Sequence, residues 1–418
     1  MRDMKMSKNI LKTKYKLAVL TSHPIQYQAP LFQKMAQQSE IDLTIYFCWD
    51  FGVSGKTYDA EFGKEIKWDI PILEGYKYKL LKNFSFEPSS KFWGQINFGI
   101  IEELIANKYD AVIIFGWNSP TNWLAFLTAF LNGTPVFLRG ENPLNQEFLK
   151  PEWKREVKKI ILGWLFKHIS AFLYLGEENK KFYQYYGADN AKLFFCPYAV
   201  DNERFISKAQ SVNREAFRKK LGVKKDDVVI LFVGKLIGKK RPMDLLKAYE
   251  ILQSAGRKAQ SVINRRFALS DLRMALLFVG DGALRSELEN YVQKNNLKNV
   301  NFVGFKNQTE MPEYYALADI LVLPSESGET WGLVANEIMC FAKPVIVSDV
   351  VGCGPNLVKP GENGYIFPLG DIEKLSQYLK NLIKNPRKIK SFGQKSFTII
   401  QNYSYEKDID CILKALNN

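Results

Sequence analysis

Metal-binding and disulfide-forming residues are scarce in this sequence. Its 418 residues include only two histidines and five cysteines, and no two cysteines stand in a C-x-x-C pair. Zinc sites need several closely spaced Cys or His ligands, and disulfide frameworks need a dense, even set of cysteines. We therefore expect no bound metal and no disulfide framework, and reduced thiols in a cytosolic protein.

Long hydrophobic runs are missing as well. No stretch reaches the roughly 18 apolar residues that a transmembrane helix needs, because the most apolar regions, 124–131 and 160–166, are short and bounded by polar residues. The first 16 residues are basic but contain no apolar core like that of a signal peptide. We expect a protein without membrane spans, whose basic lead-in is either disordered or in contact with an anionic membrane surface.

The remaining composition is that of a globular protein with an excess of positive charge. Hydrophobic residues make up 46% and charged residues 24% of the chain, which speaks against disorder and suits two domains. The net charge is +14, and most of the excess follows residue 205. Solvated lysines explain much of it, but a diphosphate, an anionic membrane or a nucleic acid would also suit this half.

Apolar runs alternate with helical stretches along the whole chain. Runs typical of strands lie at residues 16–21, 42–48, 111–115, 134–138, 169–175, 228–233, 275–279, 300–303, 320–323 and 344–347. Helical patterns fall between them, for example at 98–107 and 121–131. This alternation predicts an α/β protein of two doubly wound, Rossmann-like domains, 1–205 and 206–395, facing each other across a cleft. Residues 396–418 are expected to form a helix that packs back on the first domain.

Residues 324–341 carry the strongest chemical pattern in the sequence. A polar loop containing Glu329 follows a predicted strand, and a helix is expected to begin around Gly332. The first N–H groups of a helix have no intrahelical partner and attract anions. Glu337 lies among small and apolar residues of that helix, where an unpaired carboxylate is costly. Either ribose hydroxyls of a ligand or a neighbouring backbone or lysine group must satisfy it.

A second pattern, at residues 233–241, concentrates positive charge at another strand end. Gly234 lets the backbone approach a ligand closely, and Lys235 and Lys240 supply ammonium groups. Fixed cations stabilise a pyrophosphate that gains negative charge as it leaves. Simple exposure of the lysines to solvent is the competing explanation. The motifs G-x-x-x-x-G-K-[ST] and G-x-G-x-x-G are absent, which argues against P-loop and dinucleotide-binding chemistry.

Together these segments resemble glycosyltransferase family 4, most densely between residues 172 and 371. The matching positions are the E-x7-E pair Glu329 and Glu337, the phosphate-binding Lys235 and Lys240, and segments 186–187, 197–205, 278–285 and 301–305. The resemblance implies the GT-B fold and sugar transfer, with retained anomeric configuration, from a nucleotide-diphosphate sugar containing UDP or GDP. It also implies a glycan or lipid-linked acceptor, as in cell-surface polysaccharide or glycolipid synthesis at the cytoplasmic membrane face. No cofactor, metal or nucleic acid is expected.

The resemblance also assigns roles within the donor site. Glu337 would hold the donor ribose, and Glu329 would lie at the sugar ring beside the phosphate-binding lysines. The remaining donor-binding candidates are the backbone of Trp331, Gly332 and Leu333 near the phosphates, Gly304 and Phe305 at the nucleobase, and Gly234. Trp331, Arg241 and Lys235 replace the family's usual Phe, Gly and Arg, which leaves the identity of the donor open.

The first half of the chain matches the family poorly, as acceptor-binding halves tend to do. The usual glycine-rich loop after the first strand is replaced by residues 22–27, where His23 would contact the donor sugar or assist the acceptor, or is an ordinary loop histidine. Further acceptor-side candidates are Gln26, Tyr27, Arg139, Glu141 and Asn142. We interpret His168 as structural and the pair Asp408 and Asp410 as a solvated helix face. The basic segment 255–273 is an exposed insertion or a contact with acceptor or membrane.

Two other functions stay open at this point. A nucleotide-sugar epimerase or hydrolase would use the same fold and form product from the donor alone. A non-enzymatic protein that binds an anionic polymer would suit the charge of +14, but the embedded Glu337 would repel phosphates.

Overall fold

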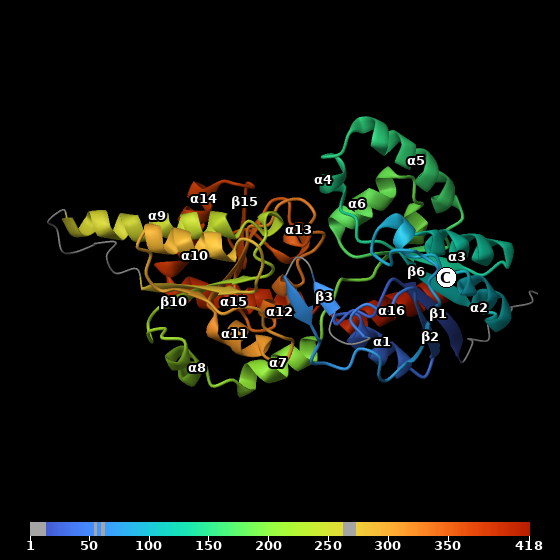
Figure 1. Cartoon of the computed structure of the whole chain (residues 1–418), viewed down its shortest axis with the longest axis horizontal. Helices are drawn as coiled ribbons and strands as arrows, with labels where there is room; N and C mark the ends of the chain where they lie inside the picture. Colours follow the sequence, from blue (N-terminus) through green and yellow to red (C-terminus); the bar gives the residue numbers. More distant parts are fainter. Residues whose placement is uncertain (1–13, 54–56, 60–62, 262–272) are drawn as a thin grey trace, which may run out of the picture.

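Two parallel sheets form the framework of the chain in the computed structural model, which describes residues 14–53, 57–59, 63–261 and 273–418. The first sheet has seven strands in the order β5-β2-β1-β6-β7-β8-β9, and the second has six in the order β12-β11-β10-β13-β14-β15. Helices cover both faces of each sheet, and the two domains lie side by side (Figure 1). The predicted pair of doubly wound domains is confirmed.

The first domain is built on a strand that alternates between two hydrophobic cores. Leu17 and Val19 of β1 pack into the core on one face of the sheet, and Ala18 and Leu20 pack into the core on the other face. Strands covered on both faces are apolar at every position, which is why the sequence shows runs rather than alternation. The sheet strands are β1 (Tyr15–Thr21), β2 (Ile41–Phe47), β5 (Lys77–Leu80), β6 (Ala111–Phe115), β7 (Val136–Arg139), β8 (Ala171–Tyr174) and β9 (Leu193–Phe195).

Helices and one separate hairpin complete the first domain. The helices are α1 (Ala29–Ala36), η1 (Phe92–Gly94), α2 (Gly99–Asn107), α3 (Pro120–Leu131), α4 (Leu144–Glu147), α5 (Glu152–Lys167), α6 (Glu177–Tyr185) and η2 (Asn190–Lys192). The antiparallel pair β3 (Thr57–Asp59) and β4 (Lys64–Ile66) stands apart from the large sheet.

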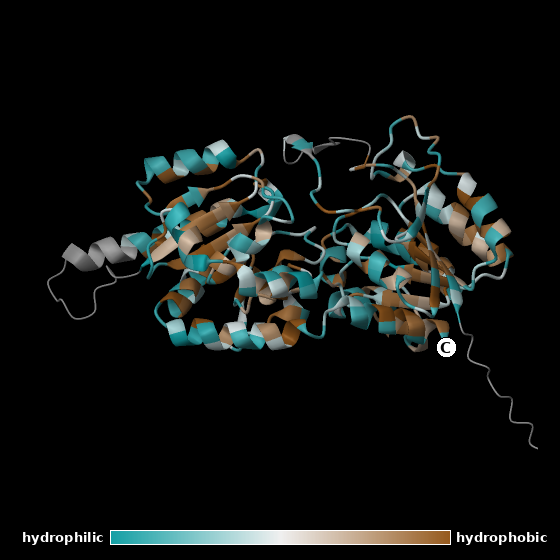
Figure 2. Ribbon diagram, turned by 90° about the horizontal axis from the view of Figure 1, so that it is seen from below, coloured by the Kyte–Doolittle hydropathy of each residue, from teal (hydrophilic) through white to brown (hydrophobic). Residues whose placement is uncertain are grey.

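The second domain repeats this construction. Val229 and Leu231 of β10 enter one core, and Ile230 and Phe232 enter the other. Figure 2 shows the strands as the most hydrophobic segments, enclosed by helices that are hydrophilic outside. The strands are β10 (Val228–Val233), β11 (Met274–Val279), β12 (Val300–Phe302), β13 (Ile320–Leu323), β14 (Val345–Ser348) and β15 (Gly364–Phe367). The helices are α7 (Asn202–Ser211), α8 (Arg214–Lys220), η3 (Gly238–Lys240), α9 (Pro242–Ser261), α10 (Arg285–Lys294), α11 (Met311–Leu317), α12 (Val334–Met339), α13 (Gly354–Leu357), α14 (Ile372–Ile383) and α15 (Pro386–Ile400).

All ten predicted strands are present, and the three sheet strands that the apolar runs missed, β5, β9 and β15, stand at sheet edges. All four residues of β5 are exposed and β9 is only partly buried, so neither shows a buried apolar run. β15 is largely buried but only four residues long. The predicted basic insertion at 255–273 begins as a continuation of α9, and residues 262–272 lie outside the described residues. The basic lead-in before residue 14 also lies outside them.

The last helix of the chain, α16 (Tyr405–Leu416), returns to the first domain. Tyr405, Ile409 and Ile412 are part of the same core as Leu17 and Val19 of β1, and α16 lies beside α1 (Figure 1). The C-terminal segment therefore consists of two helices, α15 on the second domain and α16 on the first, with the crossing between residues 400 and 405.

One residue of α16 corrects the prediction that Asp408 and Asp410 form a solvated face. Asp408 is fully buried and accepts two hydrogen bonds, 2.7 and 2.9 Å long, from the guanidinium of Arg139 at the end of β7. Asp410 is exposed, as expected. Arg139, one of the predicted acceptor-side residues, is engaged in this ion pair, which fixes α16 to the sheet.

Replacing Asp408 by alanine should lower the free energy of unfolding by about 3–5 kcal/mol, because it leaves the buried Arg139 charge unpaired. Chemical denaturation monitored by circular dichroism measures this change. Asp410→Ala, two residues along the same helix, is the matched control and should change it by about 0.5 kcal/mol or less. Equal effects of the two variants would contradict a stabilising ion pair between Asp408 and Arg139.

A cross-link at the same contact corrects the prediction of reduced thiols. Cys196, which follows β9, and Cys411 of α16 form a disulfide, with their Cα atoms 5.4 Å apart and a sequence separation of 215. Such separation leaves no local spacing pattern to recognise. Cys48, Cys340 and Cys353 are free and buried. Within the described parts of the chain, every helix is too short or too polar to traverse a lipid bilayer.

Candidate functional site

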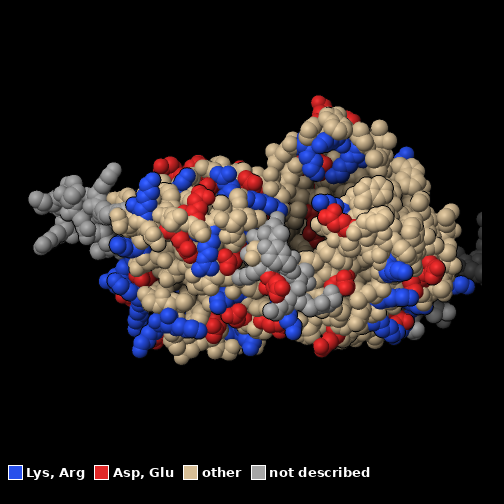
Figure 3. All heavy atoms as spheres, in the orientation of Figure 1, with Lys and Arg blue, Asp and Glu red and all other residues tan. Residues whose placement is uncertain are grey.

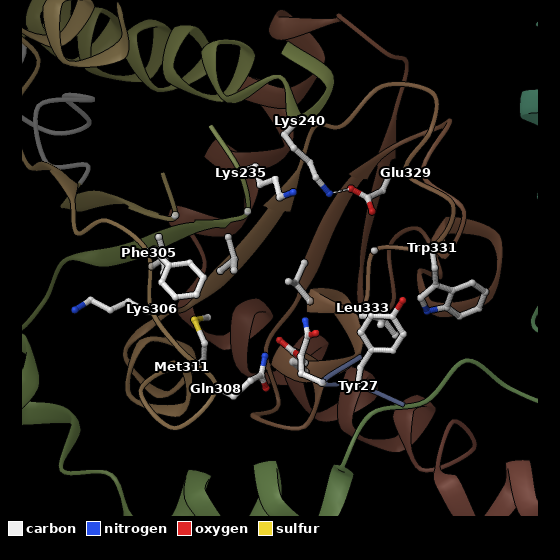
Figure 4. Close-up of a pocket in the computed structure, with 18 of the residues that line it drawn as sticks. Tyr27, Lys235, Lys240, Phe305, Lys306, Gln308, Met311, Glu329, Trp331 and Leu333 are labelled. Atoms are coloured by element: carbon white, nitrogen blue, oxygen red, sulfur yellow. Dashed lines mark hydrogen bonds and ion pairs between the residues drawn. The ribbon is translucent and has the colours of Figure 1, made fainter. Parts of the chain in front are cut away.

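A cavity of about 450 Å³ lies between the two domains, at the carboxyl ends of their strands. Figure 3 shows the molecular surface hollowed between the two lobes, and Figure 4 shows side chains that line the cavity. Twelve of the residues predicted from the sequence line it: Gln26, Tyr27, Glu141, Gly234, Lys235, Lys240, Phe305, Glu329, Trp331, Gly332, Leu333 and Glu337. The structure therefore brings together segments that are more than 300 residues apart in sequence.

The other predicted site residues lie elsewhere. Gly304 is behind the cavity wall, where its carbonyl accepts a hydrogen bond from the N–H of Gly280, a lining residue. Arg139 and Asn142 line a second cavity of about 320 Å³ within the first domain. His23 lines neither cavity.

His23 instead packs in an aromatic cluster. Its ring lies 5.3 Å from that of Phe51 and 6.0 Å from that of Trp49, and one ring nitrogen shares a hydrogen bond with the hydroxyl of Ser22 at 2.9 Å. Burial lowers the pKa of His23 to about 4, so the imidazole is neutral at pH 7 and lacks the second ring proton that an imidazolium acid would donate.

Lys240 and Glu329 form an ion pair on the second-domain wall of the cavity (Figure 4). The Ser325 hydroxyl donates a hydrogen bond of 3.2 Å to the same carboxylate. Helix η3 turns the chain after β10, so that Lys235 and Lys240 both line the cavity and neither is a fully exposed surface lysine.

Glycine is required where the strand ends β10 and β11 meet behind these lysines. A Cβ atom on Gly280 would lie 1.9 Å from the carbonyl oxygen of Gly234, a distance that two non-bonded heavy atoms cannot adopt. Both glycines also have positive φ angles, which residues with side chains rarely adopt. The close contact lets main chain, rather than side chains, form this part of the cavity wall.

Glu337 is buried in the cavity lining, with 7% of its surface exposed. Its partner is neither backbone nor lysine: the hydroxyl of Tyr315 donates a hydrogen bond to one carboxylate oxygen. Burial raises the pKa of Glu337 to about 7, although Tyr315 and the nearby Arg204 favour the ionised form. The group therefore changes charge in the physiological range and is available to accept hydrogen bonds from a ligand.

Backbone atoms of the segment between Glu329 and Glu337 also form part of the cavity wall. Gly332 has a φ of +96°, and α12 begins two residues later, close to the predicted start. Trp331 is fixed by a hydrogen bond of 2.8 Å from its indole N–H to Asn336. The side-chain amide of Asn336 donates in turn to the carbonyl of Tyr198, at 2.8 Å, in the segment that joins the domains.

The first domain contributes a hydrogen-bonded pair to the same cavity. The hydroxyl of Tyr198 donates to Glu141 at 2.7 Å, and the ring of Tyr27 packs 5.7 Å from that of Tyr198. Burial raises the pKa of Glu141, against the opposing effects of Tyr198 and Arg139. Tyr27 and Glu141 line both cavities, so the two cavities adjoin at these side chains.

Two residues that sequence reasoning missed hold the domains together at the cavity. The Gln146 side chain in α4 accepts a hydrogen bond from the N–H of Gly328 at 2.8 Å and donates to the carbonyl of Glu329 at 3.1 Å. Trp68 lines the cavity, with its ring 6.3 Å from that of Phe305. No motif marks either residue, because each acts across the domain interface.

The basic side chains that line this cavity are lysines. Among the residues that the structure describes, no cluster of three or more His, Cys, Asp and Glu side chains could hold a metal ion. Lys235, Lys239 and Lys240 line the second-domain wall, an arrangement that suits an anion.

Comparison with known proteins agrees with this arrangement. Residues 213–398 match the family model described as glycosyl transferases group 1. An uncharacterised glycosyltransferase of Methanocaldococcus jannaschii is 34% identical over 148 residues, which are 35% of this chain and 42% of the relative. D-inositol 3-phosphate glycosyltransferase of Rhodococcus erythropolis is 26% identical over 245 residues, 57% of this chain and 51% of the relative. The chain thus spans about half the length of these relatives.

Solved structures match nearly the whole chain. Anabaena HepE, crystallised with UDP and glucose, is 16% identical and superposes with a TM-score of 0.68 over 97% of this chain and 100% of its own. Sucrose-phosphate synthase of Thermosynechococcus elongatus is 16% identical, with a TM-score of 0.63 over 97% and 98%. Residues 213–398 are therefore similar to a glycosyl transferases group 1 domain, and the chain as a whole has the GT-B fold.

Proposed function

We propose that this chain is a retaining glycosyltransferase of family 4 that transfers a sugar from a UDP- or GDP-sugar to a glycan or lipid-linked acceptor. The observation that carries the proposal is the convergence of Lys240, Glu329 and Glu337 on one cavity between two domains. Its volume, about 450 Å³, lies in the range of small-molecule sites. The UDP and glucose named with Anabaena HepE support a UDP-sugar as the donor.

Each charged group has a role in donor binding. Glu337 accepts hydrogen bonds from the ribose hydroxyls with a carboxylate whose second partner is Tyr315. Lys235 and Lys240 bind the diphosphate from one side, and the main chain at Gly332 borders it from the other. Glu329, oriented by Lys240, accepts hydrogen bonds from the transferred sugar.

The reaction then follows from where charge develops. As the bond between the anomeric carbon and the diphosphate breaks, the leaving group gains negative charge, which the two ammonium groups stabilise. The acceptor hydroxyl attacks from the same face, and its proton passes to a β-phosphate oxygen, with no covalent enzyme intermediate. The lysines supply the positive charge that a metal ion would otherwise provide.

The second cavity supports a transferase over an epimerase or hydrolase of the same fold. An acceptor needs its own space, and the second cavity of about 320 Å³ adjoins the first at Tyr27 and Glu141. Its lining includes Asn118, Asn142 and the ring of Trp117, which suit the hydroxyls and apolar faces of a sugar. We assign the protein to cell-surface polysaccharide or glycolipid synthesis on the cytoplasmic side of the membrane.

A thermal-shift panel of nucleoside diphosphates and their sugars tests this proposal. UDP or GDP at about 100 times its dissociation constant should stabilise the fold by roughly 2.7 kcal/mol, while adenosine monophosphate should not. No shift with any diphosphate, combined with steeply salt-dependent binding of a polyanion, would support the polymer-binding alternative. Product formed from the donor without acceptor would support an epimerase or hydrolase.

A further inference from the structure

Helix α5 is apolar on two opposite faces, only one of which is covered by the residues that the structure describes. Leu162, Leu165 and Phe166 are buried in the first domain. On the outer side stand five large apolar residues, which we call the α5 patch: Trp153, Val157, Ile160, Ile161 and Trp164. Ile160 is 77% and Trp153 66% exposed. At 3.6 residues per turn, the five fall within a stripe about 100° wide, so they form one continuous surface.

The patch continues onto neighbouring elements. Trp164 packs against Phe130 of α3, with ring centroids 6.4 Å apart, and Leu131, the next residue of α3, is 87% exposed. Phe148, which precedes α5, is not part of this surface, because its ring packs against Arg155 on another face of the helix and against Tyr185. Contiguous apolar surface of this extent on a soluble domain marks an interaction site rather than scattered exposed residues.

Positive charge borders the patch. Helix α5 contains five basic and two acidic residues, and Lys154 and Lys167 flank the apolar stripe on either side by helical position. Both lysines are exposed. Tryptophans and aliphatic residues on one helix face with lysines at its margins are typical of helices that lie in the interface of an anionic bilayer.

Helix α5 is also connected to the cleft. Lys158, on the inner side of α5, forms an ion pair of 2.9 Å with Glu147 of α4, and Gln146 of the same short helix bonds to the carbonyl of Glu329. Figure 1 shows α4 between α5 and the second domain. A surface docked through α5 would therefore lie at the edge of the cleft, not behind it.

We propose that this protein docks on anionic lipid bilayers through the α5 patch, with Trp153, Val157, Ile160, Ile161 and Trp164 in the headgroup region and the flanking lysines on acidic headgroups. This surface differs from the two segments in which the sequence allowed a membrane contact, residues 1–16 and 255–273. The inference does not rest on the proposed transferase activity, since it concerns binding to lipid alone.

Vesicle co-sedimentation of the full chain tests the proposal. The wild-type protein should bind vesicles in which one third of the phosphatidylcholine is replaced by phosphatidylglycerol, more weakly at high salt, and should bind pure phosphatidylcholine poorly. The double variant Trp153→Ser, Ile160→Ser, which changes the two most exposed residues of the patch, should reduce partitioning into anionic vesicles by about tenfold or more. The variant Lys154→Ala, Lys167→Ala should weaken binding and reduce its dependence on salt.

The controls separate the alternatives. Lys384→Ala, Lys390→Ala removes two exposed lysines of the second domain and should bind vesicles like wild type. Unchanged thermal stabilisation by UDP or GDP in the α5 variants would establish that the donor cavity is intact. The proposal is overturned if wild type ignores anionic vesicles, or if the α5 variants bind them normally. It is overturned equally if the patch proves to join two copies, seen as a dimer by light scattering that Trp153→Ser, Ile160→Ser converts to monomer without vesicle binding.

Discussion

Lys240→Ala should lower kcat for sugar transfer by about 100- to 1,000-fold, the usual cost of removing one preorganised group that stabilises developing charge. The ammonium group lies in the cavity wall and is held by Glu329, so in the proposed complex it would contact the diphosphate without first being reorganised. The same substitution removes the partner that orients Glu329, which adds to the loss. Steady-state kinetics with the nucleotide sugar found in the thermal-shift panel measures the effect.

Two further variants distinguish a specific role of Lys240 from a general effect of lost positive charge. Lys240→Arg keeps the charge and should recover part of the lost rate. Lys247→Ala, an exposed lysine on the following helix α9, changes net charge equally but leaves the cavity wall intact, so its kcat should match wild type. Normal turnover of Lys240→Ala, or an equal loss in Lys247→Ala, would contradict the role of Lys240 at the leaving group.

The second-domain wall of the cavity could be predicted because it comes from two short segments on adjacent strands. β10 pairs with β13, so the residues that follow these strands, Lys240 and Glu329, must meet at the same sheet edge. Each segment also contains charged residues where the surrounding sequence is apolar. In one segment a carboxylate stands among apolar residues, and in the other lysines directly follow a buried strand. Such conflicts between charge and apolar surroundings are frequent at functional sites.

Contacts between distant segments could not be predicted in the same way. Gln146 supports the loop of Glu329 from the other domain, and nothing in its own neighbourhood distinguishes it from a surface glutamine. Asp408 and Asp410 are alike in sequence, yet two residues turn a helix by about 200°, so one faces Arg139 and the other solvent. Which of the two is buried depends on where α16 packs, and that is decided by the tertiary structure.

Glu337→Ala should weaken binding of the nucleoside diphosphate by about 100-fold, because hydrogen bonds to a charged group contribute roughly 1.5–3 kcal/mol each. The carboxylate is buried in the cavity lining, and the hydroxyl of Tyr315 donates a hydrogen bond to one of its oxygens. A solvent-exposed side chain therefore cannot replace it as the hydrogen-bond acceptor for the ligand. Isothermal titration calorimetry measures the loss. Glu313→Ala, an exposed glutamate on α11, should bind the nucleotide like wild type; equal loss in both variants would exclude a direct role for Glu337.

The same carboxyl group predicts a pH dependence of both binding and stability. Its pKa is about 7 in the folded protein against an ordinary value of 4.5, so the folded state retains a proton that the unfolded state has lost between these values. The free energy of unfolding should therefore fall by about 3 kcal/mol as pH rises through this window, and Glu337→Gln should remove that slope.

Ribose hydroxyls favour the ionised carboxylate, so affinity for the nucleoside diphosphate should increase from pH 6 to pH 8. The terminal phosphate of the nucleoside diphosphate also titrates near pH 6, as phosphomonoesters do. The contribution of Glu337 is therefore the difference between the affinity profiles of the wild type and Glu337→Gln. Parallel profiles would show that this carboxylate does not hold the ligand.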